Sequence, residues 1–118
     1  MKDIINEKIR FSKGDLSSDE LINFYNQLIL PRLVEEKMFI LLRQGKISKW
    51  FSAIGQEAIS VGTTLAMNDE EFVLPMHRNL GVFTTRKIDL YRLFCQFQGK
   101  IDGFTKGRDR SFHFGTIK

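Results

Sequence analysis

The chain has 118 residues, a length typical of one domain, and 42% of them are hydrophobic, including 11 phenylalanines. Nine glycines and two prolines exclude a collagen-like chain and argue against disorder. The net charge of +4 is concentrated, because residues 77–118 carry nine Lys or Arg against three Asp or Glu, whereas residues 1–60 are nearly neutral. This basic C-terminal third favours an anionic partner such as a phosphate, a carboxylate or a nucleic acid, and a solvated basic face explains it equally well.

The sequence carries no recognisable export or membrane signal. No apolar stretch approaches the roughly 20 residues that a membrane helix needs, and the first residues mix acids with bases. Cys95 is the only cysteine and stands in an apolar run, so it predicts a packed thiol and no internal disulfide. These features predict a cytoplasmic protein that binds no membrane.

A first helix is predicted from about residue 18 to residue 44. Ser17 and Glu20 have the spacing of a capping box, in which each side chain satisfies a backbone N–H group of the other residue. Gly45 stops the helix, and Pro31 predicts a kink or a break inside it. The apolar positions of the second half form one stripe, made by Leu30, Leu33, Val34, Met38, Leu41 and Leu42.

Two shorter helices are predicted further along. The second runs from about residue 56 to residue 67. Its expected apolar face consists of Ile54, Ala58, Val61 and Leu65. Residues 72–74 are typical of a brief extended segment. The third helix begins after Asp89, which caps it, and continues through Gln98 to a stop at Gly99.

Two segments before the last helix have the composition of a binding site. Trp50, Phe51 and Ser52 precede the second helix, where aromatic rings line either a small apolar pocket or the core, and the pattern alone favours the core. His77 and Arg78 follow a proline, and an arginine in such a turn is suited to hold a diphosphate or carboxylate with two hydrogen bonds. The alternative is a surface arginine beside a histidine with a structural hydrogen bond.

The loop from Gly99 to Gly115 combines glycines, basic residues and phenylalanines. Its glycines let backbone N–H groups approach an anion, but the loop lacks the spacing of a P-loop or of a dinucleotide-binding motif. His113 stands between two phenylalanines, which is typical of a half-buried histidine and compatible with a catalytic one. An RNA-binding module is the alternative, and it would use Lys106, Arg108, Arg110, Phe112 and Phe114.

The order and spacing of these segments resemble a known family. The motifs are Gly55-Gln56-Glu57-Ala58, His77-Arg78-x-x-Gly81, Gly103-x-x-Lys106-Gly107-Arg108 and Ser111-x-His113. Together, from about residue 21 to residue 115, they resemble the alpha subunit, or alpha part, of the thiamine-diphosphate-dependent decarboxylating first component of 2-oxo acid dehydrogenase complexes. The resemblance implies a mainly α fragment that forms the N-terminal part of an α/β thiamine-diphosphate-binding fold.

The resemblance also implies roles for individual residues. Arg78 would bind the diphosphate of the cofactor, with His77 at the place where the family usually has tyrosine, and His113 would be the catalytic residue that orients the substrate or acyl group. The implied substrate-binding residues are Trp50, Phe51, Ser52 and Leu80. An apolar residue at position 80 is similar to the branched-chain enzymes, so 3-methyl-2-oxobutanoate or a similar 2-oxo acid is the expected substrate.

The implied cofactors and partners extend beyond this chain. The family's Gly-Asp-Gly segment and later Asn, which hold magnesium, have no match here, so no metal ligand is assigned and the ligands are expected beyond residue 118. A beta subunit or fused beta domain and a lipoyl-bearing dihydrolipoamide acyltransferase are the implied partners, and a nucleic acid is disfavoured. Residues 1–118 are thus expected to be a truncated N-terminal portion, with an arm at 1–16 and a helical segment at 17–118, inactive alone. An inactive helical remnant is the plainest alternative.

Overall fold

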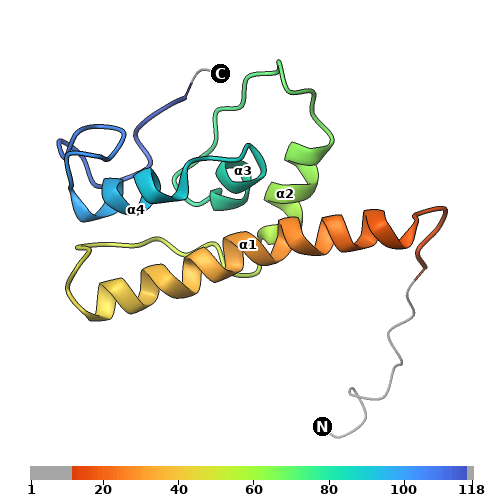
Figure 1. Cartoon of the computed structure of the whole chain (residues 1–118), viewed down its shortest axis with the longest axis horizontal. Coiled ribbons are helices and arrows are strands. Elements are labelled where there is room, and N and C mark those ends of the chain that lie inside the picture. The colour runs from red at the N-terminus through yellow and green to blue at the C-terminus, as the bar shows by residue number, and fades with distance from the viewer. Residues whose placement is uncertain (1–11, 117–118) are drawn as a thin grey trace, which may run out of the picture.

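The structure is a computed structural model that describes residues 12–116. It contains four helices, α1 (Ser18–Arg43), α2 (Glu57–Leu65), α3 (Leu80–Thr85) and α4 (Leu90–Gln98), and no strand within the described range. The long helix α1 lies along one side of the molecule, and the other three helices lie on the opposite side (Figure 1). This architecture agrees with the mainly α fragment expected. Most of the predicted N-terminal arm lies outside the described residues.

The ends of α1 are set by local sequence signals, as predicted. The backbone N–H of Glu20 donates to Ser17 Oγ at 3.2 Å, and the Ser17 N–H donates to a Glu20 carboxylate oxygen at 2.8 Å, which completes the capping box. At the other end Gly45 adopts a φ of +68°, and its N–H donates to the Leu42 carbonyl. Such a left-handed conformation is the one that glycine adopts without strain.

Of the kink or break predicted at Pro31, the break does not occur, since α1 continues through this residue from Ser18 to Arg43 (Figure 1). A proline inside a helix costs about 3 kcal/mol. Pro31 is itself buried, and Val34, Met38 and Leu41 lie on the same buried side of the helix. Each fully buried side chain of this size contributes about 1.5–3 kcal/mol, so the packing of the second half outweighs the proline penalty.

The core lies between the second half of α1 and α4. The connector at residues 44–56 runs back along α1 after Gly45 and adds its own side chains to this core (Figure 1). The buried hydrophobic residues of the cluster are Val34, Met38, Leu41, Ile47, Trp50, Leu80, Leu93, Phe97 and Phe112. The cluster therefore joins α1, the connector, α3, α4 and the loop that follows α4.

The predicted apolar face of α2 is largely wrong. Val61 is buried, but Ile54 and Leu65 are exposed, and the buried side of the helix includes Ser60 and Thr64 instead. The hydroxyls of these two residues donate to carbonyl oxygens within or just before the helix, which removes the cost of burying them. Small side chains on this face allow α3 to pack closely against α2.

The prediction for α4 is confirmed at both ends. The Asp89 side chain accepts a hydrogen bond from the Arg92 N–H at 3.1 Å, and Gly99 ends the helix with a φ of +68°. Leu93 and Phe97 face the core as expected, and Gln96 is buried with them. The helix thus places a polar side chain, Gln96, in the core beside the loop at residues 99–115, which the sequence predicted to be a binding loop.

Candidate functional site

A small open pocket lies where the connector, the segment before α3, α4 and the last loop meet. Its volume is about 140 Å³. Its walls come from Lys49, Phe51, His77, Phe97, Ser111, Phe112 and His113. Ligand pockets usually have volumes of about 300 Å³ or more, so this pocket accommodates a small molecule or one part of a larger ligand.

A buried carboxylate holds the aromatic wall of the pocket in place. Glu35 on α1 is 1% exposed and accepts two hydrogen bonds, one from Trp50 Nε1 at 2.5 Å and one from the Ala53 N–H at 2.8 Å. The Trp50 ring therefore lies in the core, 4.9 Å from the Phe97 ring between centroids. Phe51, the next residue, is exposed and forms part of the pocket wall.

His77 and Arg78 lie over the exposed side of Phe51. The His77 ring is 5.0 Å from the Phe51 ring between centroids, and the Arg78 guanidinium carbon is 5.9 Å from the Phe51 centroid. Asn79 shapes the turn, because its side-chain oxygen accepts a hydrogen bond from the Met76 N–H at 2.8 Å. The three ion pairs among residues 12–116 involve other cations, so the Arg78 guanidinium is available to an external anion.

The loop after α4 is organised by Gln96, whose side chain is completely buried. Its amide NH₂ donates to the carbonyls of Asp109 and Ser111 at 2.9 and 3.2 Å, and its oxygen accepts from the Thr105 N–H at 2.9 Å. Gly103 is required beside it, because a Cβ there would lie 2.8 Å from the Gln96 Cα. A single α4 side chain thus fixes the middle of the loop at Thr105 and its second half at Asp109 and Ser111.

His113 is held at the rim of the pocket by an acidic side chain. Its Nδ1 lies 3.0 Å from Asp109 Oδ2, and its ring is 78% exposed. The same carboxylate accepts hydrogen bonds from the Ser111 hydroxyl at 2.7 Å and from the Arg110 N–H at 2.6 Å. These donors, the Ser111 hydroxyl first, lower the pKa of Asp109 below its usual range, so the group is a carboxylate at neutral pH.

The structure brings together only part of the residues predicted from the sequence. Phe51, His77 and His113 line one pocket, and Arg78 contacts it through Phe51. The remaining residues of the predicted set lie elsewhere: Trp50 and Leu80 belong to the core cluster, and Ser52 is half-buried, with its hydroxyl accepting from the Ile54 N–H.

Sequence reasoning missed the two polar side chains that support the site. Glu35 and Gln96 are buried, and each lies next to a buried apolar residue, Val34 and Phe97 respectively. For Glu35 the sequence held a usable signal: an acidic residue stands among the apolar residues of α1, and the single tryptophan of the chain, Trp50, is a possible hydrogen-bond donor to it. No comparable signal existed for Gln96, because its partners lie in an irregular loop.

Neither a metal site nor a membrane helix is visible in the described part of the chain. Between residues 12 and 116, no group of three or more His, Cys, Asp or Glu side chains is arranged to hold a metal ion. None of the four helices there combines the length and the hydropathy needed to cross a bilayer.

Comparison with known proteins defines the class of this chain. The family model described as "Dehydrogenase E1 component" matches residues 25–118, which include every residue of the pocket and Arg78. The chain therefore belongs to the dehydrogenase E1 component family, as its motifs and their spacing indicated.

The chain is similar to alpha subunits of 2-oxoisovalerate and pyruvate dehydrogenases. The chain is 36% identical over 107 residues to the 2-oxoisovalerate dehydrogenase subunit alpha of Bacillus subtilis and 31% identical over 93 residues to that of Pseudomonas aeruginosa. It is 28% identical over 101 residues to the pyruvate dehydrogenase E1 component subunit alpha of Bacillus subtilis. These alignments cover 87%, 79% and 86% of the chain but only 32%, 23% and 26% of the relatives. No solved structure matches the chain.

Proposed function

We propose that this chain is the cofactor-facing N-terminal part of the alpha component of a thiamine-diphosphate-dependent 2-oxo acid dehydrogenase. The proposed reaction is the oxidative decarboxylation of a 2-oxo acid with transfer of the acyl group to a lipoyl group. The observation that carries the proposal is the grouping of Phe51, His77, Arg78 and His113, which come from three separate segments and meet around one pocket. The family membership of the chain supports the same reaction.

The side chains around the pocket fit the anionic end of thiamine diphosphate. Arg78 offers an exposed guanidinium, which forms paired hydrogen bonds with phosphate oxygens, and His77 adds a second donor beside it. The Phe51 ring packs against both the His77 ring and the Arg78 guanidinium. When bound, the cofactor supplies the carbanion and the electron sink that decarboxylation requires. We propose magnesium as a further counterion of the diphosphate, and none of the described residues is assigned as its ligand.

The protein's own part in the reaction is to position groups and to compensate charge. Arg78 holds the diphosphate end of the cofactor, and this contact fixes the position of the reactive end relative to the protein. His113 lines the same pocket, with one ring nitrogen held by Asp109 and the other without a side-chain partner among residues 12–116. We propose that His113 orients the carboxylate or the acyl group of the substrate through this second nitrogen.

We propose a branched-chain 2-oxo acid such as 3-methyl-2-oxobutanoate as the substrate. The pocket is small, and Phe51, Phe97 and Phe112 give it apolar walls that suit a short hydrocarbon side chain. Two of the relatives described above are named 2-oxoisovalerate dehydrogenases. Phe51 is the side chain that we propose for direct contact, whereas Trp50 and Leu80 support the walls from the core.

We propose that a beta subunit or fused beta domain completes the site. The pocket is open and too small for a whole cofactor, so further walls must come from outside the described residues. Phe72 and Leu74, between α2 and α3, are 89% and 98% exposed, and they offer apolar surface that such a partner would cover. A lipoyl-bearing acyltransferase would accept the acyl group, and a cytoplasmic location remains a prediction.

The proposal is tested by assaying the complete enzyme that carries this segment together with its beta partner. The assay follows decarboxylation with an artificial electron acceptor, with and without thiamine diphosphate, and compares 3-methyl-2-oxobutanoate with pyruvate. We expect cofactor-dependent turnover and a higher kcat/KM for the branched substrate. Turnover that does not depend on thiamine diphosphate would overturn the proposed reaction, and a preference for pyruvate would overturn the proposed substrate.

The RNA-binding alternative loses the feature that suggested it. Phe112 is 9% exposed and its ring is stacked on Phe83 at 4.8 Å, while Phe114 is stacked on Phe104 at 4.2 Å. Base-stacking platforms need exposed aromatic faces. These rings are used in internal packing, so the loop offers positive charge without a stacking surface.

A further inference from the structure

We propose that Asp109 is a positioning residue that fixes the tautomer and the orientation of His113, so that Nδ1 carries the proton and Nε2 is presented to the pocket. The inference rests on the role proposed for His113 and goes further by naming the group that makes that role possible. It concerns a pair of side chains in the loop after α4, at the rim of the pocket.

The hydrogen-bonding chemistry allows one neutral form of the histidine. A carboxylate only accepts hydrogen bonds, so His113 Nδ1, 3.0 Å from Asp109 Oδ2, must be the protonated nitrogen. In the neutral ring Nε2 then has a free lone pair. The ring is 78% exposed, and the Asp109 contact is the one side-chain hydrogen bond of His113 within residues 12–116. Without this contact, nothing in the described chain selects the tautomer.

Asp109 is itself rigidly held, which is a requirement for a positioning residue. Its N–H donates to Thr105 Oγ1 at 3.0 Å, and its carbonyl accepts from Gln96 Nε2 at 2.9 Å. Its carboxylate accepts from the Ser111 hydroxyl and from the Arg110 N–H. The chain of contacts runs from the buried Gln96 through Asp109 to the exposed ring, so the orientation of His113 is anchored in the core.

The consequence for the site concerns which way a proton moves. An Nε2 lone pair accepts a hydrogen bond or a proton from a group in the pocket, whereas an Nε2–H only donates. A histidine side chain in water favours the Nε2–H tautomer, so Asp109 reverses the intrinsic preference. His113 is thereby prepared to accept, and it becomes a donor when the ring is protonated, with the carboxylate stabilising that cation.

The tautomer is measured directly by two-bond ¹H–¹⁵N NMR of the histidine rings in the full chain at about pH 9, where histidine side chains are neutral. The chain has two histidines, and a His77→Gln sample assigns the signals. We expect the wild-type His113 pattern to be that of Nδ1–H. In Asp109→Ala the pattern should change to predominantly Nε2–H, and in Asp109→Asn, whose amide oxygen still accepts, Nδ1–H should be retained.

Asp102→Ala is the matched control, because Asp102 is an exposed carboxylate of the same loop that pairs with the Tyr91 hydroxyl and not with a histidine. It should leave the His113 pattern unchanged. An Nε2–H pattern in the wild type, or an Nδ1–H pattern that persists in Asp109→Ala, would overturn the inference. The wild-type spectrum decides the matter even if a variant fails to fold. The experiment uses no cofactor, so its outcome is independent of the cofactor assays that test the proposed function.

Discussion

Replacing Glu35 with alanine should destabilise the chain more than removal of an exposed carboxylate does. The side chain is 1% exposed, and its two oxygens accept from Trp50 Nε1 and from the Ala53 N–H. The substitution would leave both donors buried without a partner. Each such group costs about 1–3 kcal/mol, so the loss should be about 2–6 kcal/mol. Since small domains have a free energy of unfolding of about 5–15 kcal/mol, this is a large share of the total.

The measurement is chemical denaturation of the wild type, Glu35→Ala and Glu36→Ala, followed by tryptophan fluorescence and by circular dichroism. Glu36 is the adjacent, exposed carboxylate of the same helix, so its removal changes charge and helix propensity to the same extent. Its effect should stay within about 0.5 kcal/mol. Trp50 fluorescence should also shift in the folded Glu35→Ala chain. Equal stabilities of the two variants would refute the buried hydrogen-bond network.

Three further outcomes follow from the structure. Gly103→Ala should cost about 1–3 kcal/mol of stability, because its Cβ would meet the backbone of Gln96 at 2.8 Å, whereas Gly115→Ala, with open space around it, should be neutral in the same denaturation experiment. Arg32 lies 2.6 Å from Glu57 and lowers the pKa of that carboxyl in the folded chain. The pair therefore contributes to the free energy of unfolding above a pH of about 4.3, the pKa of an unperturbed glutamate, and this contribution is lost as the pH falls through the lower pKa of the folded chain. Glu57→Gln should therefore reduce the loss of stability on acidification, measured as the denaturation midpoint between neutral and acidic pH. In the complete enzyme Phe51→Ala should raise the KM for the substrate and weaken cofactor binding together, because the ring contacts both His77 and Arg78 and lines the pocket.

The features predicted correctly from the sequence are those set by residues close together in the chain. The capping box at Ser17 and Glu20 and the cap and stop of α4 at Asp89 and Gly99 involve contacts within a single turn, so the residue types alone specify them. The family assignment is also a sequence-level result, because it depends on motif order.

The features that the sequence did not predict depend on packing between distant segments. The continuity of α1 through Pro31 and the polar buried face of α2 are determined by what lies opposite each helix. The roles of Glu35 and Gln96 depend on partners 15 to 18 and 9 to 15 residues away, in segments without a regular pattern. For the site, the grouping of Phe51, His77 and His113 was foreseeable only through the family resemblance.

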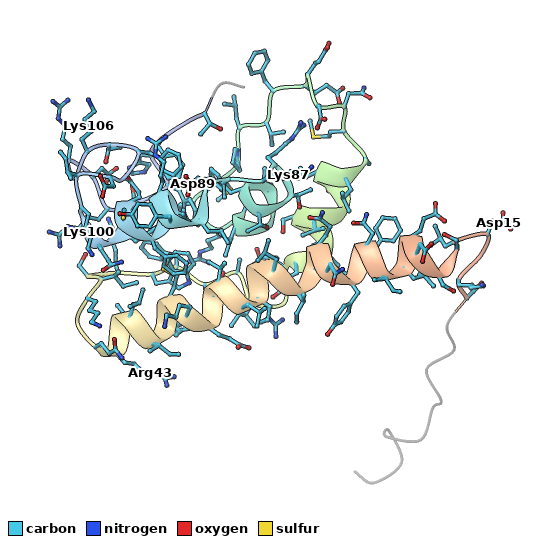
Figure 2. The ribbon with its side chains drawn as sticks, in the orientation of Figure 1. Asp15, Arg43, Lys87, Asp89, Lys100 and Lys106 are labelled. Atoms are coloured by element: carbon cyan, nitrogen blue, oxygen red, sulfur yellow. The ribbon has the colours of Figure 1, made fainter. Side chains whose placement is uncertain are left out.

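The Arg78 guanidinium is proposed to bind the diphosphate of thiamine diphosphate. This contact is tested by the affinity of the complete enzyme for the cofactor, measured by titration calorimetry, for the wild type, Arg78→Ala and Arg43→Ala. Arg43 is an exposed arginine at the end of α1 (Figure 2), and it is not among the residues that line the pocket. Loss of a charge-assisted contact to a buried anion should weaken binding by about 2–4 kcal/mol in Arg78→Ala, and Arg43→Ala should bind like the wild type. An unchanged affinity in Arg78→Ala would contradict this proposal.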